Sequence, residues 1–442
     1  MSNARRIKRD LKKCIREIAS SSDLYCQNPG VDFSRKRKLP FAEMMKAILC
    51  FSGKSLNKEL LDIFGFKDNL ATVSAFVQQR DKIKPAAFEA LFHQFTDKYA
   101  PKELYLGYRL IAVDGSDLVV PTNRDDEESL FQINEAAPYN LYHLNALFDI
   151  CSNTYLDAVV QKRLKFNEHK AFIEMLERTD VSTPTIFTAD RGYESLNTMA
   201  HIQRLEQYYL FRLKDIHSNG IASGFDLTEY GDTFDIPFDL NLTRKQSNLM
   251  KELLKDKNHY KYIPHTSTFD YLPEKSRKHD PLVFFELKFR LVRFEVSEGN
   301  YELIATNLNQ DDFPPDKLKE IYSMRWGIET SFRHLKYTLA LNNFHSKKSE
   351  CILQEVFAKL TMYNFTQTIA SHIIVLKSKR KHPYKINFSI AVHTCRNLLL
   401  GNYSPNDVEA IIQRHILPIR FDLHKPRKPN PKAYVSFSYR LA

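Results

Sequence analysis

The chain has 442 residues, 43% of them hydrophobic and 12% aromatic, so it is long and apolar enough for about two to four globular domains. The low count of 12 glycines argues against collagen-like and flexible-linker architectures. No segment approaches the roughly 18 uninterrupted apolar residues of a membrane-spanning helix. The six cysteines are widely spaced and form no C-x-x-C pair, which is typical of reduced thiols in a cytoplasmic protein.

Positive charge is concentrated at the two ends of the chain. The net charge is +11, with +7 in residues 1–40, +10 in residues 371–442 and −6 between them. Basic segments suit the phosphates of nucleic acid, and clustered carboxylates suit divalent cations. Ordinary solvated surfaces are the alternative explanation for such a distribution.

Residues 1–105 are predicted to form a helical domain that binds DNA. A basic amphipathic helix over residues 1–20 precedes the basic cluster RKRK at residues 35–38. Two short helical patterns, near residues 55–65 and 71–83, are joined by a turn. This arrangement is typical of a helix-turn-helix, or equally of two core helices in a small bundle.

The sequence changes character after this region, because strands begin to alternate with helices as in an α/β domain. A compact apolar run at residues 108–113 ends at Asp114, and a second run at residues 185–189 ends at Asp190. We expect residues 106–220 to form the first part of an α/β catalytic core.

The remaining chain divides into three predicted segments. Residues 221–312 alternate apolar and polar side chains with few helical signals, which predicts a β-rich insertion. Residues 313–376 are predicted to return to the catalytic core with two helices, the first from residue 317 to about residue 341. Residues 377–442 form a basic, proline-containing segment that is expected to follow a surface or a binding partner.

Three carboxylates stand out because of their positions. Asp114 and Asp190 each follow a predicted buried strand, and functional sites form at the carboxyl edge of an α/β sheet. Glu329 lies on the long predicted helix. Taken singly, Asp114 suits a turn before Gly115 and Asp190 suits a helix cap, so the argument depends on all three together.

One face of the long predicted helix gathers polar and aromatic side chains. At 100° per residue, an arc of about 100° contains Tyr322, Arg325, Trp326, Glu329, Arg333 and Lys336. The opposite side carries the apolar residues Ile321, Met324, Ile328, Phe332, Leu335 and Leu339. The helix can therefore bury one face while the other presents a carboxylate amid three cations and two aromatic rings. Plain core packing is the alternative for Trp326.

Such a set of side chains suits phosphoryl transfer on DNA. Two divalent cations about 3.5–4 Å apart, bridged by carboxylates, activate a water or a 3′-hydroxyl and stabilise the leaving oxygen. Oxygen ligands favour Mg²⁺, and Mn²⁺ can replace it. Arginine and lysine would neutralise the phosphates, and Tyr322 and Trp326 would stack on an unpaired base.

The segment from Tyr322 to Lys336, YSMRWGIETSFRHLK, resembles the Tyr-x2-Arg-x3-Glu-x6-Lys signature of bacterial insertion-sequence transposases. These enzymes belong to the DDE superfamily, in the branch named after insertion sequence four. Asp114 in IAVDGSDL and Asp190 in TADRGYES resemble its first and second acidic positions. The separation of 139 residues between Asp190 and Glu329 fits the family's insertion before the glutamate. The resemblance covers most of the chain, from KLPF at residues 38–41 to the C-terminal segment.

The resemblance implies an RNase H-like catalytic fold in which Asp114, Asp190 and Glu329 coordinate Mg²⁺. It also implies metal-dependent cleavage at transposon ends and strand transfer into target DNA. The expected partners are double-stranded DNA, as transposon ends and as target, and a second copy of the chain in a homodimer on DNA. No membrane partner is expected.

The resemblance extends to the DNA contacts. Family members place the equivalents of Tyr322, Arg325 and Lys336 on the terminal DNA, and Trp326 resembles a base-contacting position. Arg333 lies on the same helix face and is expected to position DNA. Arg191, next to Asp190, suits a phosphate or a carboxylate partner equally well.

Two other functions stay open at this point. One is an RNase H-like nuclease that cuts without joining, and the other is a DNA-binding protein that does no chemistry, although the intact acidic trio argues against the latter. His143 and His169 lack a partner at metal-ligand spacing, which favours structural roles. The remaining acidic residues near the predicted strands are interpreted as turn or surface groups: Asp117, Asp149, Asp157 and Glu194.

Overall fold

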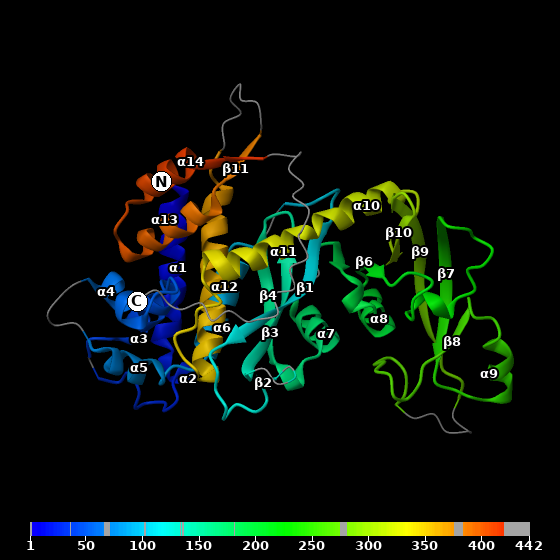
Figure 1. Cartoon of the computed structure of the whole chain (residues 1–442), viewed down its shortest axis with the longest axis horizontal. Helices are drawn as coiled ribbons and strands as arrows, with labels where there is room; N and C mark the ends of the chain where they lie inside the picture. Colours follow the sequence, from blue (N-terminus) through cyan, green and yellow to red (C-terminus); the bar gives the residue numbers. More distant parts are fainter. Residues whose placement is uncertain are drawn as a thin grey trace.

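The computed structural model describes residues 2–35, 37–65, 71–100, 103–132, 134, 137–180, 182–274, 281–374 and 383–419. They form a mixed α/β protein, with a group of helices at one end and a large sheet that extends away from it (Figure 1). In this part of the chain, no helix is long and apolar enough to cross a membrane. Lys36 of the predicted basic cluster and the basic tail at residues 424–437 lie outside the described residues.

Two sets of helices build the molecule. The helical end contains α1 (Asn3–Ser20), α2 (Ser22–Tyr25), α3 (Phe41–Leu49), α4 (Leu56–Phe64), α5 (Val73–Arg80), α6 (Ala86–Lys98), α12 (Ser349–Ser371), α13 (Phe388–Leu400) and α14 (Pro405–Arg414). The α/β part contains α7 (Glu168–Arg178), α8 (Leu196–Arg204), α9 (Asn248–Leu253), α10 (Pro315–Met324) and α11 (Trp326–Arg333), with short turns η1 (Arg163–Lys165), η2 (Arg191–Tyr193), η3 (Ala222–Gly224) and η4 (His334–Thr338). α12 packs on α3, α6 and α13, so the C-terminal helices complete the helical end that residues 1–105 begin.

The predicted helix-turn-helix corresponds to α4 and α5. The connection between them includes residues 66–70, which lie outside the described residues. A role of these two helices in DNA recognition therefore stays a prediction.

A single sheet of ten strands runs through the α/β part in the order β2-β3-β1-β5-β6-β10-β9-β7-β8, with β4 paired to β3. Its strands are β1 (Arg109–Val120), β2 (Leu130–Phe131), β3 (Tyr139–Asp149), β4 (Thr154–Lys162), β5 (Thr185–Ala189), β6 (Tyr208–Leu213), β7 (Phe234–Thr243), β8 (Tyr260–Tyr262), β9 (Phe285–Ser297) and β10 (Asn300–Thr306). A separate pair consists of β11 (Tyr384–Ile386) and β12 (Ile416–Pro418). The predicted β-rich segment thus supplies β7 to β10, which extend the central sheet through the antiparallel pairing of β10 with β6.

β1 is one continuous strand of 12 residues, so the strand that the sequence predicts up to Val113 continues through Asp114 and Gly115. Its parallel pairing with β5 ends at Val113 and Ala189, whereas its antiparallel pairing with β3 continues to Val120. The sheet therefore opens on the β5 side of β1 at the level of Asp114. Asp190 follows the end of β5 at this same opening.

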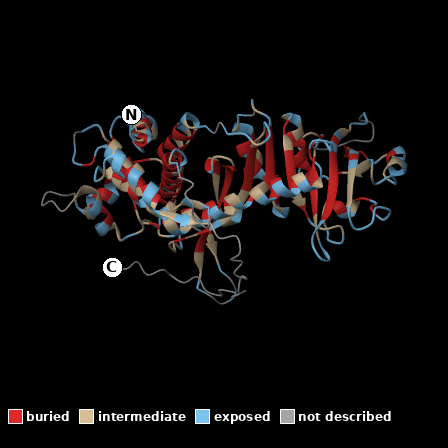
Figure 2. Ribbon diagram, turned by 90° about the horizontal axis from the view of Figure 1, so that it is seen from above, coloured by how far each residue is buried: buried red, intermediate tan, exposed pale blue. Residues whose placement is uncertain are grey.

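Alternate residues of β1 face two separate cores, as the geometry of a strand requires. Leu110 and Ala112 belong to the core that α10, α11 and α12 cover, and Ile111 and Val113 belong to the core that α7 and α8 cover. The buried residues of both cores follow the strands along the sheet (Figure 2). By the same alternation, the Asp114 side chain lies on the α11 face of the sheet.

Candidate metal centre and the helix beside it

Asp114 is a largely buried carboxylate with few partners. Its Oδ1 accepts a hydrogen bond from the backbone N–H of Gly115 at 2.8 Å, and its Oδ2 lies 3.5 Å from Arg325 Nη1. Because the residue sits inside β1, the alternative interpretation of Asp114 as a turn residue is wrong. The side chain is held at the opening of the sheet by a strand that is anchored on both sides of it.

Asp190 directly follows β5 and begins the short turn η2. Its Oδ1 accepts a hydrogen bond from the backbone N–H of Gly192 at 2.8 Å, so it caps this turn. The capping role that the sequence suggested is therefore present, and it leaves Oδ2 available for a further ligand. Asp114 and Asp190 are the residues directly after the last pair, Val113 and Ala189, of the parallel pairing between β1 and β5.

Glu329 reaches the same place from α11. Its Oε1 lies 2.9 Å from Arg325 Nη2, one helical turn earlier, and the same guanidinium contacts Asp114. Arg325 thus bridges the carboxylate of the strand and the carboxylate of the helix. The outermost of the three predicted acidic residues, Asp114 and Glu329, are 215 positions apart in the chain and share Arg325 at one edge of the sheet.

The electrostatics of this group reflect burial and crowding of negative charge. Burial raises the pKa of Asp114 to about 6, with Asp190 and Glu329 adding to the increase and Arg325 opposing it. Burial lowers the pKa of Arg325, but Tyr322 and the carboxylates of Asp114, Glu329 and Asp190 outweigh it and leave that pKa above its usual value. The positive charge of Arg325 therefore does not fully compensate the negative charge of the three carboxylates.

The donor set fits a divalent cation, although the side chains are not closed around one. Among the described residues, no three His, Cys, Asp or Glu side chains lie close enough to hold an ion in this conformation. The carboxylates are nevertheless hard oxygen ligands at a single opening, and Arg325 occupies the position where positive charge is favoured. In this conformation Arg325 contacts both Asp114 and Glu329.

The long predicted helix is divided into three parts. α10 ends at Met324, α11 begins at Trp326, and the π-helical turn η4 follows Arg333. The apolar face is buried as expected, apart from Met324, which is half-buried. A π turn winds more slowly than an α-helix, so the angle predicted for Lys336 does not hold. Instead Lys336 is half-buried. Burial lowers the pKa of Lys336, and the negative charge of Asp117 opposes this decrease.

The predicted DNA-facing residues of this helix differ in exposure. Trp326 is 52% exposed and Arg333 is also exposed, which contradicts the alternative that Trp326 is plain core packing. Tyr322 and Arg325 are buried, with the guanidinium 5.5 Å from the Tyr322 ring centroid and 6.0 Å from that of Trp326. Of the predicted polar face, Trp326 and Arg333 are therefore the residues most open to a large ligand.

Arg191 follows Asp190 and is exposed at the same opening. Of the other acidic residues near the strands, Asp117 is exposed, as expected of a surface group, and Asp149 accepts a turn hydrogen bond from the backbone N–H of Ser152 at 2.7 Å. Asp149 and Asp157 are buried, and they pair with Arg109 and Arg178 respectively. These two ion pairs connect β3 with β1 and β4 with α7, and both lie outside the group around Arg325.

The sequence analysis missed a polar group on the α7 side of the sheet. His143 was expected to be structural, and it lies between two carboxylates: Nδ1 is 2.7 Å from Asp117 Oδ1, and Nε2 is 3.0 Å from Glu168 Oε1. Glu168 was not singled out at all. A signal was present in the sequence, because Asn167 caps α7 and places Glu168 in its first turn, directly after a strand and a short connection.

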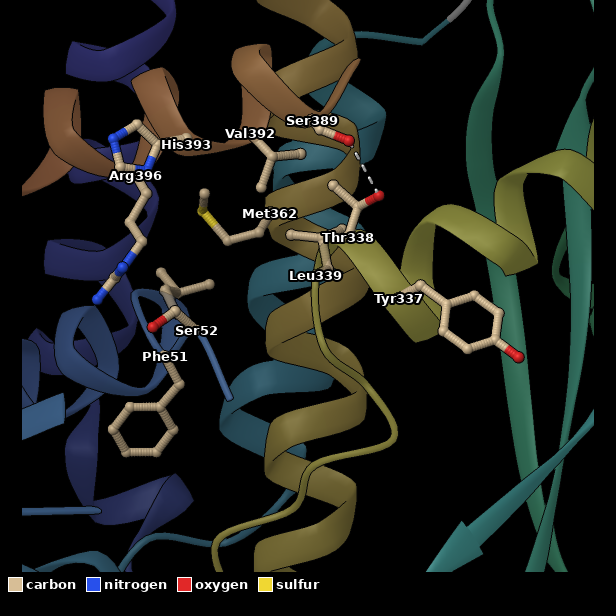
Figure 3. Close-up of a pocket in the computed structure, with 11 residues that line it drawn as sticks. Phe51, Ser52, Tyr337, Thr338, Leu339, Met362, Ser389, Val392, His393 and Arg396 are labelled. Carbon is tan, nitrogen blue, oxygen red and sulfur yellow. Dashed lines mark hydrogen bonds between the residues drawn. The ribbon is translucent and has the colours of Figure 1, made fainter. Parts of the chain in front are cut away.

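A cavity of about 480 Å³ lies elsewhere, between the helical end and η4. It is lined by residues of α3, α12, α13 and the segment after α11, and Arg396 and His393 border it (Figure 3). None of its eleven lining residues is acidic, and the Tyr337 ring points away from the other lining side chains. This cavity does not fit a metal ion, so it is separate from the carboxylate site.

Acidic residues at the edge of a mixed sheet, beside a helix with exposed basic and aromatic side chains, are typical of enzymes that transfer phosphoryl groups on DNA with divalent metal ions. Residues 105–365 match the family model described as Transposase DDE domain. Because this match spans more than half of the chain, the chain belongs to that family of transposases. It is a metal-dependent enzyme of DNA transposition, as the signature indicated.

Individual relatives agree with the family. Over 382 residues the chain is 23% identical to the transposase InsG for insertion sequence element IS4 of Escherichia coli (strain K12), covering 80% of this chain and 75% of the relative. The putative transposase InsL for IS186A of the same organism is 32% identical over 74 residues, which cover 16% of this chain and 20% of the relative. A solved piggyBac transposase synaptic complex with hairpin DNA aligns with a TM-score of 0.48 and 10% identity, over 89% of this chain and 80% of that chain.

Proposed function

We propose that Asp114, Asp190 and Glu329 are the metal-binding and catalytic residues of this transposase. The observation that carries the proposal is the Arg325 guanidinium, which lies 3.5 Å from Asp114 and 2.9 Å from Glu329. One cation is thus already shared by a carboxylate of β1 and a carboxylate of α11. We propose Mg²⁺ as the physiological ion and Mn²⁺ as a substitute, because all three donors are carboxylate oxygens.

In this proposal, the carboxylates bind the metal ions, and the basic and aromatic side chains contact DNA during cleavage and joining. Bound divalent ions supply a Lewis acid that activates the attacking oxygen and stabilises the leaving oxygen at phosphorus. Asp114 and Asp190 are fixed by β1 and β5, so they keep their places when DNA binds. Arg333 and Trp326, both exposed on α11, reach the DNA backbone and an unpaired base. Tyr322, Arg325, Lys336 and Arg191 position DNA closer to the carboxylates.

We propose further that the strand order β4-β3-β1-β5-β6, in which β3 is antiparallel to the other four strands, is an RNase H-like core. On this core the enzyme cleaves at transposon ends and transfers the strand into target DNA. The helical end and the basic C-terminal segment are the proposed binding surfaces for those ends. A homodimer that pairs two ends is part of the proposal.

The test compares carboxylate variants on a plasmid that carries the DNA flanking the coding sequence, and on a pre-cleaved end. Asp190→Asn and Glu329→Gln should reduce Mg²⁺-dependent cleavage and strand transfer by on the order of a thousandfold, since several kcal/mol of charge stabilisation is lost. DNA binding should persist. Asp239→Asn, an exposed carboxylate of β7, is the control and should cleave normally. Normal cleavage by Asp190→Asn would refute the assignment, and cleavage by the wild type without joining would identify a nuclease.

A further inference from the structure

Glu168 lies between the backbone segments that follow Asp114 and Asp190. A Cβ at position 115 would clash with His143 and lie 2.7 Å from Glu168 Oε1. A Cβ at position 192 would lie 3.7 Å from Glu168 Oε2 and 3.0 Å from Asp190 Oδ1. Two glycines therefore give the Glu168 carboxylate the space to approach both strand ends.

The Glu168 side chain is held loosely. Its Oε1 lies 3.0 Å from His143 Nε2, but this contact does not have hydrogen-bond geometry, and the ring nitrogen makes no hydrogen bond with the described residues. On its other side, His143 Nδ1 is within hydrogen-bond distance of Asp117 Oδ1 at 2.7 Å. Glu168 is one-quarter exposed, so it keeps access to the opening. An ion pair without a hydrogen bond orients a carboxylate and still allows it to turn.

Tyr193 lies in the turn η2 that follows Asp190, and its side chain is buried. Tyr193 is 1% exposed, and its Oη makes no hydrogen bond within the described part of the chain. Besides burial, the groups that raise the pKa of this hydroxyl are Glu168, Asp114 and Asp190, in that order. An unpaired buried hydroxyl costs about 1–3 kcal/mol, so the arrangement lacks one polar ligand beside these three carboxylates.

We propose that Glu168 is a fourth acidic residue of the metal centre, oriented by His143 and Asp117, and that the Tyr193 hydroxyl donates to the water that hydrates the ions. This inference rests on the proposed function of Asp114 and Asp190. Two divalent cations carry four positive charges, and three carboxylates with Arg325 among them do not balance these charges. A fourth carboxylate at the opening brings the site close to neutrality.

The experiment measures Mn²⁺ binding to the full-length protein without DNA. Trp326 is the single tryptophan of the chain and its ring lies 6.0 Å from the Arg325 guanidinium, so paramagnetic Mn²⁺ at the site should quench its fluorescence. Wild type should show saturable quenching. Glu168→Gln should weaken the apparent Mn²⁺ affinity about tenfold or more, and Tyr193→Phe should weaken it severalfold.

Controls separate metal binding from structure. Glu174→Gln changes an exposed carboxylate of the same helix, which pairs with Arg178, and should bind Mn²⁺ as wild type does. Metal-free Tm should be unchanged in Glu168→Gln, and unchanged or higher in Tyr193→Phe, because the lost hydroxyl had no partner. If Glu168→Gln does not fold, Glu168→Asp decides, since it keeps the charge but shortens the reach. Its expected affinity is below that of wild type.

Two outcomes distinguish this inference from the proposed function. If Asp114→Asn abolishes quenching while the Glu168 variants bind Mn²⁺ like wild type, Glu168 is not part of the centre and the three-carboxylate site stands. If wild type shows no saturable quenching, or Asp114→Asn binds Mn²⁺ normally, the proposed metal site is wrong and the role of Glu168 fails with it.

Discussion

Two buried groups of charged residues in this molecule shift the pKa values of their carboxylates in opposite directions. In the helical end, Glu59 accepts hydrogen bonds from the backbone N–H groups of Ser52 at 2.6 Å and Lys54 at 2.9 Å, and Arg396 lies 3.3 Å away. Burial alone raises the pKa of Glu59, but hydrogen bonds from His345, Ser52 and Lys54 outweigh it and lower the pKa to about 2. At the sheet opening, burial dominates instead and raises the pKa of Asp114 to about 6.

The difference separates a structural use of charge from a functional one. Around Glu59, a second carboxylate, Glu355, pairs with Arg80 and His345, and Lys359 donates to the Phe51 carbonyl, so every charge has partners. Around Asp114, by contrast, the carboxylates have few donors and the Tyr193 hydroxyl has none in the described residues. A buried network in which every charge is paired stabilises the packing of helices and strands. A buried group with excess negative charge instead favours binding of a cation.

Breaking the paired network should have the largest effect on stability. Glu59→Gln takes this carboxylate away from Arg396 and leaves His345 paired with Glu355, which should cost about 3–5 kcal/mol in the free energy of unfolding. Urea denaturation at pH 7 measures this loss. Glu43→Gln, which removes an exposed partner of Lys46, should change stability by no more than about 1 kcal/mol. A loss of under 1 kcal/mol for Glu59→Gln would show that the network contributes little.

The acid limb of the stability curve sharpens this contrast. A lowered folded-state pKa means that the stability from Glu59 is present above its unfolded pKa of 4.5 and is lost as the pH falls toward 2. In Glu59→Gln this part of the acid destabilisation should be missing.

Removing the under-neutralised carboxylate should act in the opposite direction. Asp114→Asn is expected to stabilise the metal-free protein by about 2–3 kcal/mol at pH 8, because a raised folded-state pKa makes the ionised form unfavourable. Relative to this variant, wild type loses stability as the pH rises from about 4 to about 6, and the difference is constant above that range. Urea denaturation in EDTA at pH 4 and pH 8 measures both values. Equal destabilisation at both pH values would contradict this account of Asp114.

The sequence predicts one of these two groups far better than the other, for physical reasons. Asp114, Asp190 and Glu329 follow local rules, since strand ends and helical periodicity are readable from neighbouring residues. The Glu59 network depends on tertiary packing, because Arg396 reaches Glu59 across 337 positions of the chain. For Glu168 the sequence marks the start of α7 at Asn167, but only the packing of α7 brings this carboxylate beside Gly115 and Gly192.

Errors at the site itself also have identifiable causes. A glycine after Asp114 is a turn signal, but pairing with β3 keeps this residue inside a strand, and His143 and Glu168 explain the need for a glycine. The sequence also predicted one regular helix where a π turn changes the direction of Lys336. At Asp114, tertiary pairing overrode the local turn preference.

Substitution of Arg325 should have a smaller effect, and it tests whether the carboxylates at the sheet opening lack positive charge. Its guanidinium competes with a divalent ion for Asp114 and Glu329, so Arg325→Gln should bind Mn²⁺ more tightly, on the order of tenfold, in the absence of DNA. Quenching of Trp326 fluorescence measures this affinity. Arg333→Gln, an exposed arginine of the same helix, is the matched control. Weaker Mn²⁺ binding in Arg325→Gln would show that the guanidinium organises the carboxylates and does not compete for them.

The smallest expected effect belongs to Arg333, whose contribution should be limited to DNA. Arg333 is exposed and does not belong to the carboxylate group, so Arg333→Gln should leave the Mn²⁺ affinity and the free energy of unfolding unchanged. Its loss should reduce the slope of log K against log salt concentration by about 1 for a duplex oligonucleotide, as one phosphate contact disappears. Lys288→Gln, on the exposed side of β9, should leave the slope unchanged. If both variants give the wild-type slope, DNA does not pass along this face of α11, and the cation that matters there is Arg325 alone.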